Sequence, residues 1–580
     1  MSLPVTHPTD ILEIALPANP LESWLSAEMI QRLEKQLLPG YLPAQRWFGG
    51  KAKVIASVKV EDWATLPVAD TLPQAAPVLL VLRVTYQGNE QEWYQLPLAW
   101  VGADCWTEAK YQLLPLLRAT FTAEVESETP CLAVTRYLVH GRACQALCQS
   151  LLQFMENGTA VTFNSGRVLR ATTTQALQQQ PLGSDAVDRQ VAPAYFEQSN
   201  TSIQYGRQAL LKLFCRLEPG ENPDYEIGRF LTEQARFSHT PETLGALHWC
   251  PSQPGQPDWT LGILHRWVDN QGTAWDFWQH LLAEYWQQTL LTTQPQPTQP
   301  ALPLLLQEEV RLLAKRTAAM HQALVTRQAQ NLSFCAEALT ETDWQWSLQQ
   351  VEQQFASVFE AVEKIYPVLA EEFQQPLALL RKQKHHLQQQ LHTFKQQTPL
   401  GAVKTRVHGD YHLGQVLRVE NDYLILDFEG EPQRTLQERR LKQSPLKDVA
   451  GMMRSFSYAV YASLLSPSPH LSSECLAVVH PLAANPEQLQ AYAQPLANTL
   501  LQVFWQHYSA QMTRPDPTTV GSDGLDCDAA QDVSLQHGLL SLYLLEKALY
   551  ELMYELNHRP DWLAIPAYGL LACVSSEASC

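Results

Sequence analysis

The sequence has 580 residues, of which 45% are hydrophobic, and a formal net charge of −18. A chain of this length exceeds one ordinary hydrophobic core, so we expect two to four folded units. The acidic balance argues against a general nucleic-acid partner or an anionic membrane surface, because phosphate contacts need clustered Lys and Arg. It does not exclude one small phosphorylated ligand, which needs only a local basic group or a metal ion.

Cysteine content and the N-terminal residues bear on the compartment. The eleven Cys, an odd number, do not indicate a disulfide framework in so long a chain. The first residues include Asp10, Glu13 and Glu22 and lack a basic segment followed by an apolar one, so no signal peptide is expected. No uncharged apolar run reaches membrane-spanning length. The sequence therefore predicts a soluble, cytoplasmic protein with no membrane partner.

The N-terminal part of the chain is rich in strand patterns. Residues 54–60, 78–86 and 92–101 are continuously apolar or alternate apolar with polar residues, which is typical of strands. Residues 159–173 resemble strands joined by Asn-Ser-Gly, and the polar stretch at 173–190 indicates an exposed loop. These patterns predict a small sheet-rich unit.

The pattern becomes sharper after residue 194. Residues 194–217 indicate a strand, a tight turn and a strongly apolar second strand that contains one lysine, Lys212. NPDYEIGRFLTEQ follows with a helical period, and its Asp224 is a candidate N-terminal cap. LGILHRWV, at 261–268, is predicted to be a further strand.

Long helical periods dominate the chain beyond about residue 270. They cover 274–291, 304–324, 344–363, 377–395, 487–511 and 531–557. The Pro- and Gln-rich residues 292–303 are predicted to form a loop between helices. A strand-rich first half followed by a helical second half predicts a two-lobed α+β protein.

Two polar segments between these helices carry groups suited to phosphoryl transfer. RVHGDYHLGQVL contains Asp410 and Gln415, and the apolar start of ILDFEGEP leads to Asp427. Phosphoryl transfer needs a carboxylate beside the attacking hydroxyl and oxygen ligands for Mg²⁺ across the phosphates of the nucleotide. A loop with Asp and an amide five residues apart, followed by a hairpin strand that ends in Asp, delivers all three groups to one cleft.

The first half supplies a cation for the phosphates. Lys212 is a lone charge in an apolar strand, and its burial is costly without a partner. Glu226, in the helix that follows, is the expected partner, since a Lys–Glu pair beneath a loop holds ATP in protein-kinase-like enzymes. The loop is EQSNTS, in which Ser199, Asn200 and Thr201 offer hydroxyl, amide and backbone donors.

Six stretches occur in chain order: LPGYLPAQRWFGGK, EQSNTS with LLKLFCRLEPGENPDYEIGRFL, RVHGDYHLGQVL, ILDFEGEP, SPLKDVAGMMRSF and EKALYELMYELNHRPDWL. Together they resemble the maltokinases, bacterial enzymes that make maltose 1-phosphate from ATP and maltose. The stretches extend from about residue 38 to residue 563, nearly the whole chain. HGDxH alone would indicate only the broader aminoglycoside-phosphotransferase-like group.

The resemblance implies a bilobal protein-kinase-like fold in three parts. These are an N-terminal cap subdomain at 1–110, a nucleotide-binding subdomain of the N-terminal lobe at 111–267, and a mainly helical C-terminal lobe at 268–580. It also implies ATP and Mg²⁺ as cofactors and phosphorylation of maltose at its anomeric hydroxyl, which feeds trehalose and glycogen metabolism. Some maltokinases are fused to a trehalose synthase, so association with that enzyme is a further expectation.

Carried over to this sequence, the resemblance assigns the roles of the central residues. Asp410 becomes the catalytic carboxylate, Gln415 and Asp427 become the Mg²⁺ ligands, and Lys212 becomes the phosphate-binding lysine. The strand GILHRWV is expected to lead into the hinge where backbone groups meet adenine.

Sugar recognition is expected from groups beside the catalytic carboxylate. In EKALYELMYELNHRPDWL, Lys547, Tyr550 and Tyr554 recur on one helical face. His412 is a further candidate, equally consistent with local support of its loop, and the two tyrosines are equally consistent with core packing.

Other residues of the motifs have structural interpretations. Asp448 and Arg454, in KDVAGMMRSF, are predicted to hold the catalytic loop from a helix. His408 is expected to support the same loop by packing, and QRWFGGK is expected to be structural within the cap.

Two alternatives to maltose phosphorylation stay open. One is a related sugar kinase, such as a glucosamine kinase, with the same lobes. The other is a nucleotide-binding scaffold without turnover, against which the presence of Asp410, Gln415, Asp427 and Lys212 argues.

Overall fold

The computed structural model describes residues 13–16, 24–51, 53–68, 76–102, 117–122, 133–183, 190–194, 200–251, 255–291, 301–325, 332–396, 402–466, 471–512, 533–559 and 562–575. The chain divides into two compact units. Unit 1 comprises Met1–Gln234 and Pro241–Asp269, and unit 2 comprises Ala235–Thr240 and Asn270–Cys580. The strand-rich first half and helical second half are confirmed, and the finer three-part division stays a prediction.

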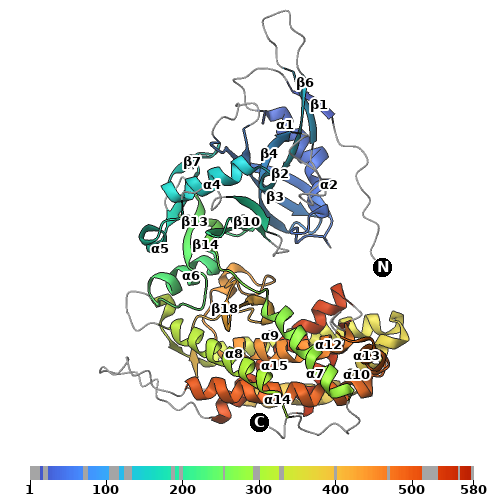
Figure 1. Cartoon of the computed structure of the whole chain (residues 1–580). Helices are drawn as coiled ribbons and strands as arrows, with labels where there is room; N and C mark the ends of the chain where they lie inside the picture. Colours follow the sequence, from blue (N-terminus) through green and yellow to red (C-terminus); the bar gives the residue numbers. More distant parts are fainter. Residues whose placement is uncertain are drawn as a thin grey trace, which may run out of the picture. The chain divides into compact units, whose positions relative to one another are not determined.

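Unit 1 contains two sheets, which Figure 1 shows in blue to green. In spatial order, the first sheet consists of β1 (Glu13–Leu16), β5 (Leu117–Thr122), β6 (Ala133–His140), β4 (Gln91–Gly102), β3 (Val78–Tyr86) and β2 (Ile55–Thr65), with β12 (Arg216–Leu217) also paired to β4. The second sheet consists of β7 (Ala160–Thr162), β8 (Val168–Thr173), β13 (Thr243–Cys250), β14 (Trp259–Arg266), β11 (Ala209–Leu213), β10 (Thr201–Tyr205) and β9 (Val191–Ala194). The strands predicted near 54–60, 78–86 and 92–101 are confirmed as β2, β3 and β4.

Helices cover these sheets and correct one prediction. They are α1 (Ala27–Arg32), η1 (Leu33–Leu37), α2 (Leu38–Ala44), η3 (Gly141–Ala143), α4 (Gln145–Asn157), α5 (Gln175–Gln179) and α6 (Pro223–Glu233). The loop predicted at 173–190 was wrong in part, because α5 forms there around the buried Leu177. Residues 184–189 of that stretch lie outside the described residues.

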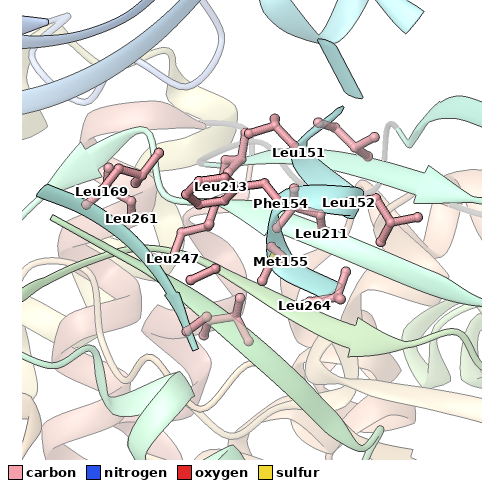
Figure 2. Packing of buried hydrophobic residues seen from close by; sticks show 14 of the residues in the cluster. Leu151, Leu152, Phe154, Met155, Leu169, Leu211, Leu213, Leu247, Leu261 and Leu264 are labelled. Carbon is pink, nitrogen blue, oxygen red and sulfur yellow. The ribbon is translucent and has the colours of Figure 1, made fainter. Parts of the chain in front are cut away.

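One hydrophobic core joins α4 to the second sheet. Figure 2 shows Leu151, Leu152, Phe154 and Met155 of α4 packed with leucines of β8, β11, β13 and β14. Full burial of each such side chain contributes about 1.5–3 kcal/mol. This packing fixes β11, the strand that carries Lys212, from its covered face.

The two sheets of unit 1 are also joined through their backbones. β12 pairs with β4, so the chain directly after β11 extends the first sheet. Gln95 of β4 donates its backbone N–H to Cys215 O at 2.9 Å, and its side-chain Nε2 donates to Phe214 O at 2.7 Å. The side chain of Gln95 also donates to Leu261 O of β14. The first sheet therefore holds the ends of two strands of the second.

Unit 2 is mainly helical (Figure 1). Its helices are α7 (Ala274–Leu290), α8 (Leu304–Ala323), η4 (Leu332–Phe334), α9 (Glu341–Ile365), η5 (Tyr366–Val368), α10 (Glu371–Gln396), η6 (Leu413–Gln415), α11 (Leu436–Arg439), α12 (Leu446–Leu465), α13 (Ser473–Ala483), α14 (Pro486–Met512), α15 (Val533–His558) and α16 (Ala564–Ser575). Its strands form the pairs β15 (Glu337–Ala338) with β16 (Val403–Lys404) and β17 (Val416–Val419) with β18 (Asp422–Ile425).

The helices predicted from periodicity are confirmed, with shifted ends. The largest shift is at α10, which begins at Glu371 rather than at 377 because the helix continues through Pro376, a residue that usually marks a first turn. The predicted hairpin is confirmed as β17 and β18, in which Val416 pairs with Ile425. Among the described residues, no helix is long and apolar enough to cross a membrane.

Candidate active site

Asp410 lies on a loop of unit 2 whose backbone is held by the first turn of α12. The buried carboxylate of Asp448 accepts the backbone N–H of His408 at 2.8 Å and that of Gly409 at 2.9 Å. Gly409 has a φ of +86°, a left-handed conformation that glycine adopts without strain. The prediction that Asp448 holds this loop from a helix is confirmed.

Asp448 is itself supported by a buried histidine. His321 of α8 lies 3.1 Å from Asp448 Oδ2 through Nε2 and 2.9 Å from the Tyr508 hydroxyl through Nδ1. Burial raises the pKa of Asp448, but the hydrogen bond and charge of His321 outweigh burial and hold that pKa below its ordinary value. Asp448 therefore stays ionised and accepts strong hydrogen bonds from the loop.

Close packing between the loop and α12 requires glycine at one position. A Cβ on Gly451 would lie 2.6 Å from the carbonyl oxygen of Tyr411, so a larger residue would push the loop away from the helix. Ser455, one turn later, accepts the backbone N–H of Leu413 through its hydroxyl at 3.0 Å. Three positions of α12 thus fix the distance between the loop and the helix and the path of the loop backbone.

Arg454 does not hold the loop of Asp410, so the role predicted for this residue was wrong. Its Nη2 donates to Glu551 Oε2 at 2.7 Å, so it joins α12 to α15 rather than to the loop. A helix presents each position to a different neighbour, and Arg454 lies on the face of α12 that packs against α15 and Gly569 of α16.

His408 supports the loop by packing, as predicted. Its Nε2 contacts Leu426 O at 2.7 Å, and its Nδ1 accepts the backbone N–H of Asp410 at 3.4 Å. Its ring centre lies 4.8 Å from that of Phe428. His408 therefore connects the loop of Asp410 to the segment that carries Asp427.

Asp410 has a cationic partner on α15. Lys547 Nζ lies 2.9 Å from Asp410 Oδ1, and both side chains are less than a fifth exposed, at 16% and 17%. Burial lowers the pKa of Lys547, but the negative charges of Asp410 and Glu431 outweigh burial and raise it above its ordinary value. His412 Nε2 lies 4.0 Å from the other carboxylate oxygen, Oδ2.

His412 has a local role in addition to its place beside Asp410. Its Nδ1 accepts the backbone N–H of Gly414 at 3.0 Å. Burial lowers the pKa of His412, which favours the neutral ring at physiological pH. The ring therefore supports the turn into η6 while its Nε2 side faces the carboxylate, and its contact with a sugar stays a prediction.

The predicted metal ligands lie beside one another. Gln415 ends η6, Asp427 follows β18, and Gln415 Nε2 lies 2.9 Å from Asp427 Oδ2. Asp427 has a φ of +63°, a left-handed conformation that is uncommon outside glycine. Carboxylate and amide oxygens are donors that Mg²⁺ accepts, so this pair fits the expected ion.

In unit 1, Lys212 has an acidic partner that sequence analysis assigned to another role. Lys212 is on β11, its side chain is 4% exposed, and its Nζ lies 3.1 Å from Asp224 Oδ2. The prediction of Asp224 as the helix cap was wrong: Asn222 is the N-cap of α6 and accepts the backbone N–H of Asp224 at 2.8 Å. Glu226 is buried in the same helix, and its pairing with Lys212 stays a prediction.

The predicted phosphate loop is described only at its end. Ser199 lies outside the described residues. Asn200 precedes β10, and Thr201 begins it, with its hydroxyl 3.4 Å from Cys215 Sγ inside the sheet. The hydroxyl of Thr201 thus has a partner within the protein, and the contacts of Asn200 and Thr201 with phosphate stay a prediction.

The predicted sugar-binding face of α15 extends away from Asp410. Lys547 Nζ lies 4.7 Å from the ring centre of Tyr550, which is next on this face. Tyr554, one turn further, is 37% exposed, and its ring stacks on that of His558 at 4.4 Å. An exposed aromatic ring can pack on the apolar face of a sugar, and sugar contacts of Tyr550 and Tyr554 stay a prediction.

Sequence reasoning missed a cluster of charges around Lys547. Glu431 lies 3.5 Å from Lys547 and 2.7 Å from Arg434. Glu546 lies 2.6 Å from Arg434 and 3.3 Å from Lys447. These residues come from three separate segments with no common spacing, so no local pattern could have indicated their contact.

Comparison with known proteins supports the fold and the cap. Residues 41–114 match the maltokinase N-terminal cap domain family. Two curated relatives are glucosamine kinases: one from Streptacidiphilus jiangxiensis is 40% identical over 52 residues, and one from Mycolicibacterium smegmatis (strain ATCC 700084 / mc(2)155) is 29% identical over 175 residues. These matches cover 9% and 30% of this chain but only 12% and 35% of the relatives.

A solved structure of glucosamine kinase in complex with glucosamine, ADP and inorganic phosphate is similar over nearly all of both chains. It covers 92% of this chain and 98% of the other, with a TM-score of 0.53 and 17% sequence identity. The expected fold, with strand-rich N-terminal sheets and a helical C-terminal region, is therefore shown. The cap match confirms the resemblance to maltokinases over residues 41–114.

Proposed function

We propose that this chain, which carries the cap domain of the maltokinases and shares the fold of glucosamine kinase, is an ATP-dependent sugar kinase that phosphorylates maltose at its anomeric hydroxyl. The products are maltose 1-phosphate and ADP, which would place the enzyme in trehalose and glycogen metabolism. The observation that carries the proposal is the pair of supported acidic segments in unit 2, one presenting Asp410 and the other presenting Asp427 beside Gln415.

The proposed chemistry assigns one role to each supported group. Asp410 accepts a hydrogen bond from the anomeric hydroxyl, orients its oxygen toward the γ-phosphorus and takes the proton as the new O–P bond forms. The bond between the γ-phosphorus and the β–γ bridging oxygen breaks, and ADP leaves. Bound Mg²⁺ supplies charge neutralisation of the phosphate oxygens, and Gln415 and Asp427 are the residues that would hold it.

Unit 1 would bind the nucleotide. Lys212, kept in place by Asp224, is the proposed phosphate-binding cation, with Glu226, Ser199, Asn200 and Thr201 as further candidates. A lysine whose position is fixed by an acidic partner is suited to charge-assisted hydrogen bonds with a polyanionic ligand. The backbone of β14 and the residues after it is the proposed contact for adenine.

Maltose is the preferred acceptor because the cap family is that of maltokinases. His412, Tyr550 and Tyr554 are the candidate contacts for the two glucose rings, and Lys547, the fourth residue predicted there, also pairs with Asp410. Glucosamine is the second candidate acceptor, favoured by the two curated relatives and by the solved structure. Association with trehalose synthase is proposed only as a partner to be tested, by co-purification from cells that contain both proteins.

A substrate comparison tests the proposal. Purified protein would be incubated with ATP, MgCl₂ and either maltose, glucosamine or glucose, and ADP release would be measured against a sugar-free control. We expect kcat/KM for maltose to exceed that for glucosamine by at least about 100-fold, a discrimination typical of sites that hydrogen-bond their substrate. Turnover of glucosamine but not of maltose would replace maltose as the acceptor, and no sugar-dependent turnover would overturn the proposed activity.

A further inference from the structure

Six charged residues, Asp410 among them, form a continuous chain of alternating sign, which we call the Lys547 network. The order is Asp410, Lys547, Glu431, Arg434, Glu546 and Lys447, with each neighbouring pair within 3.5 Å. All six side chains are largely buried. They come from the catalytic loop, the segment after Asp427, α12 and α15. Three cations balance three carboxylates, so the network carries no net charge.

Lys547 contacts only one of the two oxygens of Asp410. Its Nζ hydrogen-bonds Oδ1 at 2.9 Å. His412 Nε2 lies 4.0 Å from Oδ2, beyond hydrogen-bond distance. A carboxylate anchored through one oxygen has a defined orientation and keeps the other oxygen available to a hydroxyl donor. The position of Lys547 is thus suited to fixing the orientation of the Asp410 carboxylate.

Glu431 is the second carboxylate that contacts Lys547. The ammonium group lies between two carboxylates, 2.9 Å from Asp410 and 3.5 Å from Glu431. Glu431 is fixed in turn by Arg434 Nε at 2.7 Å, so it cannot follow Lys547 away from its position. Because Lys547 is shared between two carboxylates, its ammonium group is held at a fixed place beside Oδ1 of Asp410.

We propose that Lys547 is a positioning residue for Asp410 rather than a sugar ligand, and that Glu431 acts through Lys547 by holding its ammonium group at Oδ1 of Asp410. This inference rests on the proposed phosphoryl transfer, in which the acceptor hydroxyl loses its proton to Asp410. Oδ2 receives that proton while Oδ1 stays on Lys547. The role of Arg434, Glu546 and Lys447 is to keep Glu431 ionised and in place.

Three variants test this division of roles: Lys547→Met, Glu431→Gln and the double variant. Steady-state kinetics would be measured with whichever sugar the wild-type protein phosphorylates best. Lys547→Met is expected to lower kcat by about 100-fold, the effect of a misplaced catalytic group, with the KM for sugar within about twofold of wild type. Glu431→Gln is expected to lower kcat by about tenfold, again with the KM for sugar unchanged.

The double variant shows whether Glu431 acts through Lys547. If it does, Glu431→Gln lowers kcat by less than about twofold when Lys547 is already methionine, because the residue it acts on is gone. Independent effects that multiply to about 1,000-fold would overturn the inference, since the two residues would then act separately. A rise in the KM for sugar with unchanged kcat in Lys547→Met would return Lys547 to the role of sugar ligand.

A matched control and a conservative variant separate positioning from folding. Glu551→Gln removes a buried carboxylate from the same helix, where it pairs with Arg454 rather than with the network. Lys547→Met is expected to lower kcat by the same factor in a protein that carries Glu551→Gln as it does in the wild-type protein. Lys547→Arg keeps the cation and is expected to recover at least tenfold of the lost kcat, and no recovery would contradict the electrostatic role.

The same experiment distinguishes failure of this inference from failure of the proposed function. A wild-type protein that transfers phosphate to no sugar overturns both. An active wild-type protein whose Lys547→Met variant keeps its full kcat overturns only the positioning role.

Discussion

Asp448→Asn is the substitution that most directly tests how the loop of Asp410 is held. The carboxylate accepts two backbone N–H groups of the loop, at 2.8 and 2.9 Å, through different oxygens, and it also contacts His321 at 3.1 Å. Asparagine has one acceptor oxygen and one NH₂ group. Whichever way the amide is oriented, at least one N–H of His408 or Gly409 faces a donor.

The expected cost follows from these contacts. Hydrogen bonds to a charged group contribute about 1.5–3 kcal/mol each, and the neutral amide weakens those that remain. Because the site is fully buried, water does not replace the lost bond. We therefore expect Asp448→Asn to lower the free energy of unfolding of unit 2 by about 3–5 kcal/mol. Displacement of Asp410 is expected to lower kcat by about 100-fold.

Urea unfolding monitored by tryptophan fluorescence, together with kinetics at saturating ATP and sugar, measures both effects. Asp422→Asn is the matched control: Asp422 contacts Arg316 twice at 2.6 Å but is about a third exposed, so its loss is expected to cost only about 1 kcal/mol. A loss of stability below 1 kcal/mol in Asp448→Asn, or an unchanged kcat, would refute the reasoning.

Three further predictions concern the neighbouring groups. Gly451→Ala places a Cβ 2.6 Å from Tyr411 O and is expected to cost about 1–3 kcal/mol in urea unfolding; an unchanged midpoint would show that the loop yields freely. Burial raises the pKa of Glu431, but Lys447, Lys547 and Arg434 outweigh it and hold that pKa at about 2, below the ordinary 4.5. A carboxylate whose pKa is lowered in the folded state stabilises the fold at pH values above its ordinary pKa, and this stabilisation is lost as the pH falls toward the lowered pKa. Glu431→Gln should therefore cost about 3 kcal/mol at pH 7 and progressively less toward pH 2. A cost that does not change with pH would contradict this. Asp427→Ala should raise the Mg²⁺ concentration for half-maximal activity at least about tenfold, and an unchanged Mg²⁺ dependence would remove Asp427 from the metal site.

The fold was predictable where one local pattern decides the structure. The apolar run at 78–86 forms the buried strand β3, and the hairpin of Val416 and Ile425 forms as expected. The cap of α6 was misassigned because both Asn222 and Asp224 are good N-cap residues, and sequence alone does not show that Asp224 is needed by Lys212. Tertiary pairing decided between two locally acceptable choices.

The site was predictable in its parts and not in its connections. Gln415 and Asp427 are close in sequence and are brought together by one hairpin. Glu431 and Lys547 are far apart, and their contact depends on how α15 packs over the loop, which no spacing encodes. Arg454 was assigned to the loop for a related reason: its helix was identified, but the direction of its face was not.

Identification of the phosphorylated atom tests the central claim most directly. Wild-type protein and Asp410→Asn would be incubated with maltose and ATP-Mg²⁺, the product position would be read by two-dimensional ¹H–³¹P NMR, and ATP binding would be measured by calorimetry. We expect phosphate on the anomeric oxygen with wild type, and loss of product with ATP affinity within about threefold of wild type in Asp410→Asn. Phosphate on any other hydroxyl, or undiminished product from Asp410→Asn, would contradict the account.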